Sequence, residues 1–349
     1  MKAQHAGRPR LAAIVTVVAV AAALAATGAS TARSGPARAT AKKPVIALSN
    51  SFIGNSWRKQ MVKSFSDVAA QAKKQGLIAD YTVANANNTV EQQISQINGL
   101  ILKHVDAIVV DAASPTALNG VIAKAVKAGI TVVSFDGTVT SPLSYNLNYD
   151  FLGFGNHIGE YVANRIGNKG NVLIVRGVAA TIIDQQEHKG WQQTLAKQPG
   201  IKVVGTVFGN WDDATAQAAV ARILPSLPEV NAVVMNGGGY GVSQAFAAAN
   251  RPTPLIYLGN RGYELRWWAE QNAKNGYTTE SASTTPSVST AAFWVAVNVR
   301  KGVKFPHNLK MDFLTITQKD LPKYKDLPLD AVAATPYSNE WVLSHFPHK

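Results

Sequence analysis

Short apolar runs alternate with stretches of helical periodicity over most of this 349-residue chain. Val45–Ser49 predicts a strand, because it is short, apolar and bounded by polar residues. In the helix expected from Ser56 onward, apolar side chains recur at intervals of four, three and four residues, which is helical spacing. These side chains are Met61, Phe65, Val68 and Ala72. Asp106–Val110 is continuously apolar, which is typical of a strand buried on both faces of a parallel sheet.

This alternation occurs twice and predicts an α/β fold with two doubly wound parallel-sheet lobes. The further expected strands are Ile78–Val83, Ile130–Phe135, Asn171–Val175, Ile201–Phe208, Asn231–Met235 and Leu255–Leu258. The chain is expected to cross between lobes at Ser144–Asp150, at Ser281–Pro286 and near Leu314–Ile316, which makes a three-segment hinge. The helix Val288–Val299 then returns to the first lobe. The first lobe is therefore predicted to contain residues 44–147 and 285–312, and the second lobe residues 148–284 and 313–349.

The first 41 residues have the layout of a secretory signal. Lys2, Arg8 and Arg10 precede an apolar run from Leu11 to Ala26, and small residues follow, with an A-x-A pattern at Ala39–Ala41. The run is short for a membrane span, which needs about 20 residues. A cleaved signal is the prediction, and an uncleaved anchor or an ordinary helix are the alternatives. A cleaved signal and an uncleaved anchor both predict export to a periplasm or cell surface.

Charge and cysteine content exclude several classes of protein. The formal net charge is +13, of which the first 41 residues carry five, leaving +8 for the rest. The remaining basic residues are scattered, which favours solvated faces over a nucleic-acid surface. There is no cysteine, so disulfides, thiol nucleophiles, Cys-based zinc sites and a lipoprotein anchor are excluded. The histidines lack metal-ligand spacing, and we expect no metal and no cofactor.

Ligands of doubly wound sheets bind at the carboxyl ends of the strands, so the loops there are the candidate site. These loops are rich in Asn, Asp, Ser and Trp, which suit a polyhydroxylated ligand: amides and carboxylates pair with hydroxyls, and indoles cover C–H faces. The loops are Ser51–Trp57, Asp111–Ser114, Asp136–Thr138, Gly177–Glu187, Asn210–Asp213, Asn236–Tyr240 and Asn260–Tyr263. Gly237–Gly239 lacks the spacing of a dinucleotide fingerprint and predicts a close backbone approach or a flexible turn.

The order and spacing of these segments resemble the ribose/galactose-type periplasmic sugar-binding proteins, whose core is shared with LacI-type repressors. The resemblance extends from about Pro44 to Gln318. The segments that carry it are Ile46–Ser51, Asn55–Trp57, Asn87–Thr89 with Gln92 and Gln93, Asp106–Val110, Gly129–Asp136 and Gly190–Gln193.

The resemblance implies a set of first-lobe ligand contacts. Ser51 and Asn55 correspond to a polar pair near the sugar hydroxyls, Trp57 to a stacking aromatic, and Asp111 to a polar amide. Asp136 corresponds to a carboxylate that accepts hydrogen bonds from hydroxyls. In ribose-binding relatives an arginine follows this aspartate. Here Gly137 does, and we expect Arg58 to supply the missing charge.

In the second lobe the resemblance implies Trp211 as the opposing aromatic and Asn236 as an amide contact, with Asp184 as a weaker candidate. Glu187 falls where the family often has arginine, and Arg261 where it often has aspartate, so we infer an exchange of charges. Thr284 stands where a glutamine is usual. Each residue also has a structural interpretation: core packing for the tryptophans, helix capping for Asp136, a turn for Asn236, and solvated positions for Glu187, Asp184 and Arg261.

The resulting prediction is an exported binding protein, a monomer, that captures a small neutral sugar or sugar alcohol for an ABC importer. The alternative is a sensor that presents the sugar to a membrane receptor. A LacI-type repressor is disfavoured because Val45 opens the first strand directly behind the leader, without room for a DNA-binding headpiece. An enzyme is disfavoured because the loops contain no recognisable nucleophile–base pair, phosphate-binding loop or metal cluster.

Overall fold

The computed structural model describes residues 42–179 and 181–349, so the predicted leader lies outside the described residues. Its first sheet is parallel throughout, in the order β11-β5-β4-β3-β1-β2. The strands are β1 (Val45–Asn50), β2 (Asp80–Asn85), β3 (Ala107–Asp111), β4 (Thr131–Phe135), β5 (Tyr145–Asn148) and β11 (Asn308–Lys310). Helices α1 (Ser56–Lys74) and α9 (Val288–Arg300) cover one face, and α2 (Val90–Leu102) and α3 (Asn119–Lys127) cover the other.

Burial on both faces explains the apolar runs in the central strands. Ile46 and Leu48 of β1 pack into the core beneath α1 and α9, whereas Ala47 between them packs into the core beneath α2 and α3. Val109 and Ile108 of β3 divide in the same way. Successive side chains of a strand point to opposite faces, so a strand covered by helices on both sides needs apolar residues at every position.

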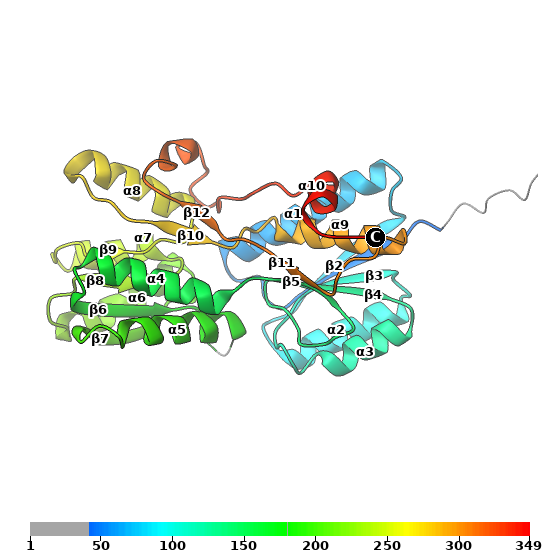
Figure 1. Cartoon of the computed structure of the whole chain (residues 1–349), viewed down its shortest axis with the longest axis horizontal. Coiled ribbons are helices and arrows are strands. Elements are labelled where there is room, and N and C mark those ends of the chain that lie inside the picture. Colours follow the sequence, from blue (N-terminus) through cyan, green and yellow to red (C-terminus); the bar gives the residue numbers. More distant parts are fainter. Residues whose placement is uncertain (1–41, 180) are drawn as a thin grey trace, which may run out of the picture. The chain divides into compact units, whose positions relative to one another are not determined.

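The second sheet is also parallel, in the order β7-β6-β8-β9. The strands are β6 (Lys169–Arg176), β7 (Gly200–Phe208), β8 (Ala232–Val234) and β9 (Leu255–Ile256). Helices α4 (Phe151–Arg165) and α5 (Ile182–Leu195) cover one face. The other face is covered by α6 (Asp213–Ile223), η1 (Leu224–Ser226), α7 (Gly239–Ala248) and α8 (Gly262–Asn275). The predicted α/β fold with two lobes is confirmed, and Figure 1 shows the lobes side by side.

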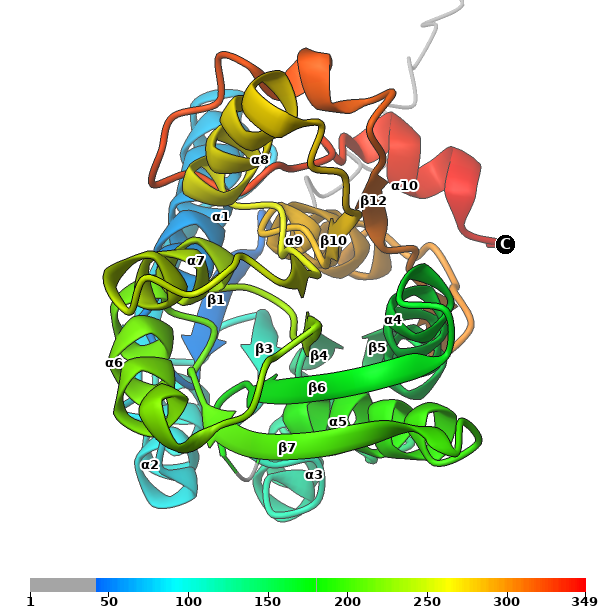
Figure 2. The same cartoon turned by 90° about the vertical axis from the view of Figure 1, so that its left-hand side faces the viewer.

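Three segments connect the lobes. The first follows β5, which is a strand inside the stretch Ser144–Asp150 that was predicted only as a crossover. The other two form an antiparallel pair, β10 (Ser281–Ser283) with β12 (Leu314–Ile316). In the end-on view of Figure 2, this pair lies above the second sheet, close to α9. Antiparallel pairing of two crossing segments gives the hinge a hydrogen-bonded core.

The last part of the chain differs from the predicted division, which assigned residues 313–349 to the second lobe. After η2 (Leu321–Tyr324) the chain runs back, and α10 (Asn339–His345) packs on α9. Val342 and Phe346 are buried in the core beneath α1 and α9. The physical reason is the apolar face of α10, which finds its complement on the first lobe.

The returning segment also joins the lobes at the rim of the cleft. The side-chain amide of Gln60 on α1 donates to Val332 O at 2.9 Å and accepts from Val332 N at 2.8 Å. The same segment bonds to the loop after β9, where Gly262 N donates to Ala331 O and Ala333 N to Asn260 O. Residues 331–333 therefore contact both lobes at once.

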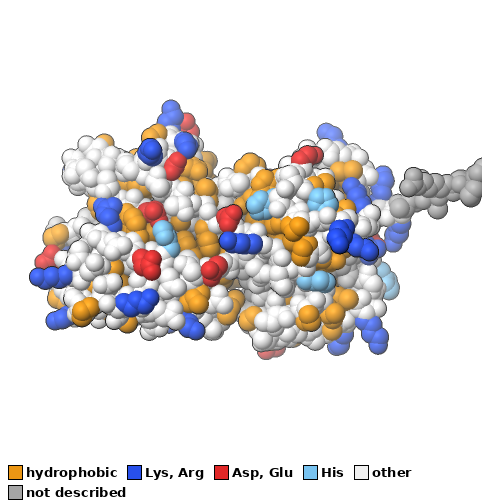
Figure 3. All heavy atoms as spheres, in the orientation of Figure 1, with side chains coloured by type: hydrophobic (Ala, Val, Ile, Leu, Met, Phe, Trp, Pro, Cys, Tyr) orange, Lys and Arg blue, Asp and Glu red, His pale blue; other side chains and the backbone are white. Residues whose placement is uncertain are grey.

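No helix within the two described ranges has the length and apolarity required to cross a membrane. On the face shown in Figure 3, basic side chains are spread among acidic and uncharged ones and do not gather into one patch. The scattered charges of the sequence are therefore scattered on this face as well.

Truncating Phe293 tests the role of α9 in the first lobe. The ring is fully buried and meets Phe65 edge-on, with 5.8 Å between ring centroids. Phe293→Ala is expected to lower the free energy of unfolding by about 3–5 kcal/mol, because it leaves a cavity in the core. Leu102→Ala, at a side chain that is 78% exposed, is expected to change it by less than about 0.5 kcal/mol. Urea unfolding measures both, and equal effects would contradict this packing.

Candidate functional site

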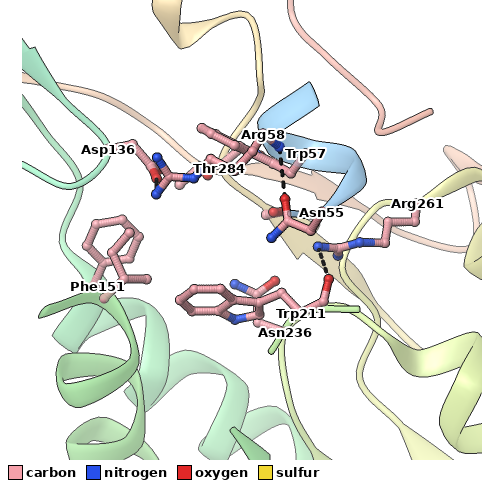
Figure 4. A pocket seen from close by; sticks show the side chains of 11 residues that line it. Asn55, Trp57, Arg58, Asp136, Phe151, Trp211, Asn236, Arg261 and Thr284 are labelled. Atoms are coloured by element: carbon pink, nitrogen blue, oxygen red, sulfur yellow. Dashed lines mark hydrogen bonds and ion pairs between the residues drawn. The ribbon is translucent and has the colours of Figure 1, made fainter. Parts of the chain in front are cut away.

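A small cavity lies between the lobes, and both lobes and the hinge line it. Figure 4 shows its side chains converging from α1, from the loop after β4, from the hinge and from the strand ends of the second lobe. The lining residues are Asn55, Trp57, Arg58, Asp136, Phe151, Ile183, Trp211, Asn236, Arg261, Ser283 and Thr284. Seven of these are residues that the sequence singled out as ligand contacts.

Asn55 and Trp57 occupy the cavity because of how α1 begins. Asn55 is the N-cap, and its Oδ1 accepts from Arg58 N at 2.9 Å. This leaves the amide Nδ2 of Asn55 as the group available to a ligand. The Trp57 indole donates to Thr284 O of the hinge at 3.0 Å and packs partly into the first-lobe core. Trp57 is therefore both a core residue and a wall of the cavity.

Arg58 joins two carboxylates that follow separate strands. Its guanidinium forms an ion pair with Asp111 and lies 3.8 Å from the Asp136 carboxylate. A hydrogen bond of 3.2 Å to Asn50 Oδ1 adds a third contact. Burial lowers the pKa of Arg58, and the Asp136 carboxylate opposes this effect. Burial likewise raises the pKa of Asp136, against the neighbouring Arg58. The arginine expected beside Asp136 is thus supplied from α1.

Trp211 lies across the floor of the cavity, on the second lobe (Figure 4). Its indole rests on Gly177, where an added Cβ would come within 2.1 Å of the ring. Its backbone carbonyl accepts from Arg261 Nη2 at 3.0 Å. The Arg261 guanidinium also donates to Gly259 O and packs against Gly237, where a Cβ would again collide. The glycine run thus permits a close approach, as predicted.

Several residues at the strand ends have left-handed backbone conformations. Asp136 has φ +54°, Asn210 +55°, Trp211 +54° and Asn260 +64°. Asn and Asp tolerate this region, but for tryptophan it is uncommon. Such conformations cost of order 1–3 kcal/mol each and cluster at binding sites, where surrounding structure maintains them. Of these residues, Asp136 and Trp211 line the cavity, whereas Asn260 donates to Leu314 O and accepts from Ser281 Oγ of the hinge strands.

Four predicted site residues do not line this cavity. Ser51 lines an adjoining cavity that shares Asn55, Arg58 and Trp211 with the first. Asp111 lies behind Arg58, and Glu187 lies behind Asn236, whose Nδ2 donates to Glu187 Oε1 at 2.8 Å. Asp111 and Glu187 therefore support lining side chains and do not form the wall themselves.

The fourth residue, Asp184, is bonded to the protein through both of its carboxylate oxygens. Its Oδ1 accepts from Gly177 N at 2.9 Å and from Arg176 Nε at 3.2 Å, and its Oδ2 pairs with Arg176. Both oxygens are therefore occupied within the loop between β6 and α5. The structure places Asp184 as the support of the glycine on which Trp211 rests, away from the cavity wall.

Sequence reasoning missed Phe151, Ile183 and Ser283. Phe151 and Ile183 are apolar residues in the first turns of α4 and α5, and nothing in their chemistry distinguishes them from core residues. Ser283 lies inside the predicted crossover Ser281–Pro286. The position of crossovers at the mouth of the cleft was the one available signal for it.

Comparison with known proteins agrees with this geometry. A family model described as "Periplasmic binding protein domain" matches residues 46–304. The chain belongs to this family. A solved ABC transporter solute-binding protein from Thermobispora bispora is 39% identical, with a TM-score of 0.82 over 86% of this chain and 94% of that one. The fold and the two-lobed cleft are therefore those of periplasmic binding proteins.

Two curated relatives are similar over shorter stretches. A xylitol-binding protein of Mycolicibacterium smegmatis is 32% identical over 184 residues, which is 52% of each chain. A D-ribose/D-allose-binding protein of Pseudomonas aeruginosa is 28% identical over 232 residues, 63% of this chain and 71% of that protein. The chain thus matches about half the length of the first relative and somewhat more of the second. Like them, it is a binding protein by family.

Removing Arg58 is expected to lower the free energy of unfolding, because the Asp111 carboxylate stays buried without a cation. Arg58→Met leaves a fully buried carboxylate without its cation and should lower the free energy of unfolding by about 3–5 kcal/mol at neutral pH. An unpaired buried carboxyl has a folded-state pKa above its unfolded value, so the deficit should shrink as pH falls and Asp111 becomes protonated.

Lys63→Met on the exposed side of the same helix is the control, and Arg58→Met combined with Asp111→Asn should recover most of the loss. Chemical denaturation without ligand measures all three variants. The ion pair would be irrelevant to stability if Arg58→Met and Lys63→Met behaved alike.

Proposed function

We propose that this protein captures a small neutral sugar or sugar alcohol between its lobes and delivers it to an ABC importer. The observation that carries the proposal is a set of buried polar atoms around the cavity that have no protein hydrogen-bond partner. On residues that line the cavity, these atoms are Asp136 Oδ1, Asn236 Oδ1 and Arg261 Nε. A buried polar atom without a partner costs about 1–3 kcal/mol, so a ligand rich in hydroxyls stabilises the closed form by satisfying several of them.

The charges of the cavity favour a neutral ligand. Arg58 is shared between Asp111 and Asp136. The positive charge of Arg261 is opposed by Asp213 and Glu264. Burial raises the pKa of both carboxyl groups, and Arg261 works against that rise. Glu264 accepts from the backbone N–H groups of Gly239, Gly259 and Arg261. Because each cation already faces carboxylates, no ligand charge is required for balance.

The walls provide the apolar surface that a sugar or polyol also needs. Trp57, Phe151, Trp211 and Ile183 lie among the polar groups. Aromatic and aliphatic faces cover the C–H surface of a polyhydroxylated ligand, while the amides and carboxylates meet its hydroxyls. The names of the relatives, which bind xylitol and D-ribose or D-allose, support the same class of ligand.

Capture is proposed to work by closure. A ligand that touches α1 on one lobe and Trp211 on the other makes its full set of contacts only when the lobes are together, so it shifts the population toward the closed state. Closure removes water, which strengthens each satisfied polar contact and penalises each hydroxyl left unpaired. Selectivity between stereoisomers follows from that penalty.

The family supports the remaining parts of the proposal. We expect this protein to be exported by its leader, to present the closed lobes to a membrane permease, to act as a monomer and to turn over no substrate. Within the described ranges there is no cluster of three or more potential metal-ligating side chains.

A thermal-shift screen of residues 42–349 tests the proposal. The panel contains pentoses, hexoses and C4–C6 sugar alcohols, with acidic sugars as a contrast. A ligand that binds only the folded state raises the melting temperature, by an amount equivalent to about 2.7 kcal/mol at 100 times Kd. A shift with one stereochemical subset supports capture of a neutral ligand. A shift with acidic sugars alone contradicts neutrality, and no shift with any member contradicts the proposal.

Gly177→Ala tests the placement of Trp211 without altering any polar group. The new Cβ would occupy the position of the indole, so Trp211 must move and affinity is expected to fall by about tenfold or more. Gly120→Ala on α3 is the matched control, because its Cβ would meet nothing within 4 Å. Isothermal titration with the ligand found in the screen compares them, and unchanged affinity for Gly177→Ala would contradict this role for Trp211.

A further inference from the structure

Glu187 is a fully buried carboxyl group without a cation. It lies on α5 and has no exposed surface. Asn236 Nδ2 donates to its Oε1 at 2.8 Å, while its Oε2 has no hydrogen-bond partner. The Trp211 indole N–H lies near the carboxyl and acts to lower its pKa, although neither Trp211 Nε1 nor Glu187 Oε2 has a hydrogen-bond partner of normal geometry. Both of these neighbours line the ligand cavity.

Asp184, one turn earlier on the same helix, provides a direct comparison. Its carboxylate pairs with Arg176 and accepts from a backbone N–H. Within the described residues, Glu187 forms no ion pair of this kind. Two acids with similar burial therefore have opposite environments, and an ionised carboxyl without compensation is costly in a buried position.

The other charged groups around Glu187 also disfavour its ionisation. The carboxylates of Asp184 and Asp136 both act to raise its pKa, and Tyr257 faces it from the end of β9. Arg176 is occupied by Asp184, and the neighbouring His188 has its ring against Trp191. Burial is the largest cause, and together these effects raise the pKa of Glu187 to about 8.

We propose that Glu187 is a neutral carboxylic acid in the ligand-bound state and acts as a positioning residue for Asn236. This inference rests on the proposed function. Because Asn236 donates to Oε1, the proton resides on Oε2. The Asn236 amide nitrogen is then committed to Glu187, and its unpartnered Oδ1 is the atom presented to the ligand, where it accepts from a hydroxyl.

Ionisation of Glu187 is expected to oppose capture. Asp136 belongs to the first lobe and Glu187 to the second, so closure brings a second negative charge toward the Asp136 carboxylate. The neutral form avoids this repulsion. Ligand affinity should therefore be highest below about pH 8 and fall as the pH rises through that value.

The experiment is a titration of wild type with the ligand from the screen across pH 6 to 9.5. If only the neutral form binds, Kd is expected to weaken about tenfold between pH 7 and pH 9, because the pKa of Glu187 in the ligand-free protein is about 8. Glu187→Gln retains an acceptor for Asn236 and a donor in place of Oε2–H, so its affinity should stay within about threefold of wild type at pH 7 and vary little with pH. Glu91→Gln, at an exposed glutamate on α2, should follow the wild-type profile.

A wild-type profile without this loss, or a Glu187→Gln profile that retains it, would overturn the inference. A measurement without ligand distinguishes failure of the Glu187 inference from failure of the proposed function. The infrared difference between wild type and Glu187→Gln at pH 6 is expected to contain the carbonyl stretch of a protonated carboxylic acid. A carboxylate signal there would overturn the inference, whatever ligand the protein binds, whereas a screen without any ligand would count against the function alone.

Discussion

Arg58 reaches from the first turn of α1 to carboxylates at the ends of two different strands, and much of the site follows from that contact. Asp111 is buried because β3 is a central strand, so it needs a cation nearby. Arg58 satisfies Asp111, and its second contact lies toward Asp136 at the cavity wall. The start of α1 is fixed in turn by the Asn55 cap, which places Trp57 beside the hinge. One ion pair thus links a sheet, a helix and the hinge.

In the second lobe, the buried charged groups near the cavity have different partners. Its cation, Arg261, donates to backbone carbonyls and is opposed by Glu264 and Asp213 at longer range. Its buried acid, Glu187, has an amide as its partner. The two lobes therefore present dissimilar surfaces to a ligand: a charge-paired wall on α1 and a wall of amide, indole and guanidinium opposite. A ligand with different hydroxyl arrangements at its two ends fits such an asymmetric cleft in a single orientation.

The fold could be read from the sequence because doubly wound sheets impose strong patterns. Buried strands must be apolar at every position, helices must show their own period, and ligands meet the strand ends, which is why the loops that contain Asn55, Asp136 and Asn236 were candidates. Arg58 was expected only from the resemblance to the family. The sequence did not predict which of these side chains point into the cavity and which lie behind its wall. Asp184 and Glu187 are both acids on the inner face of one helix, and the presence of Arg176 beside Asp184 separates their roles. Phe151 and Ile183 lack any chemical signature, and α10 is too short for its packing partner to be evident.

The packing of α9 and α10 on the first lobe has a consequence for how the chain acquires its structure. The apolar face of β1, β3 and β4 is covered by α9, and the edge of that layer by α10. Both helices come from the last fifth of the sequence. A chain that emerges from its N-terminus must therefore complete the second lobe's strands before the first lobe can close its own core. The lobe whose strands are made first therefore obtains its last core helix only when the end of the chain is available.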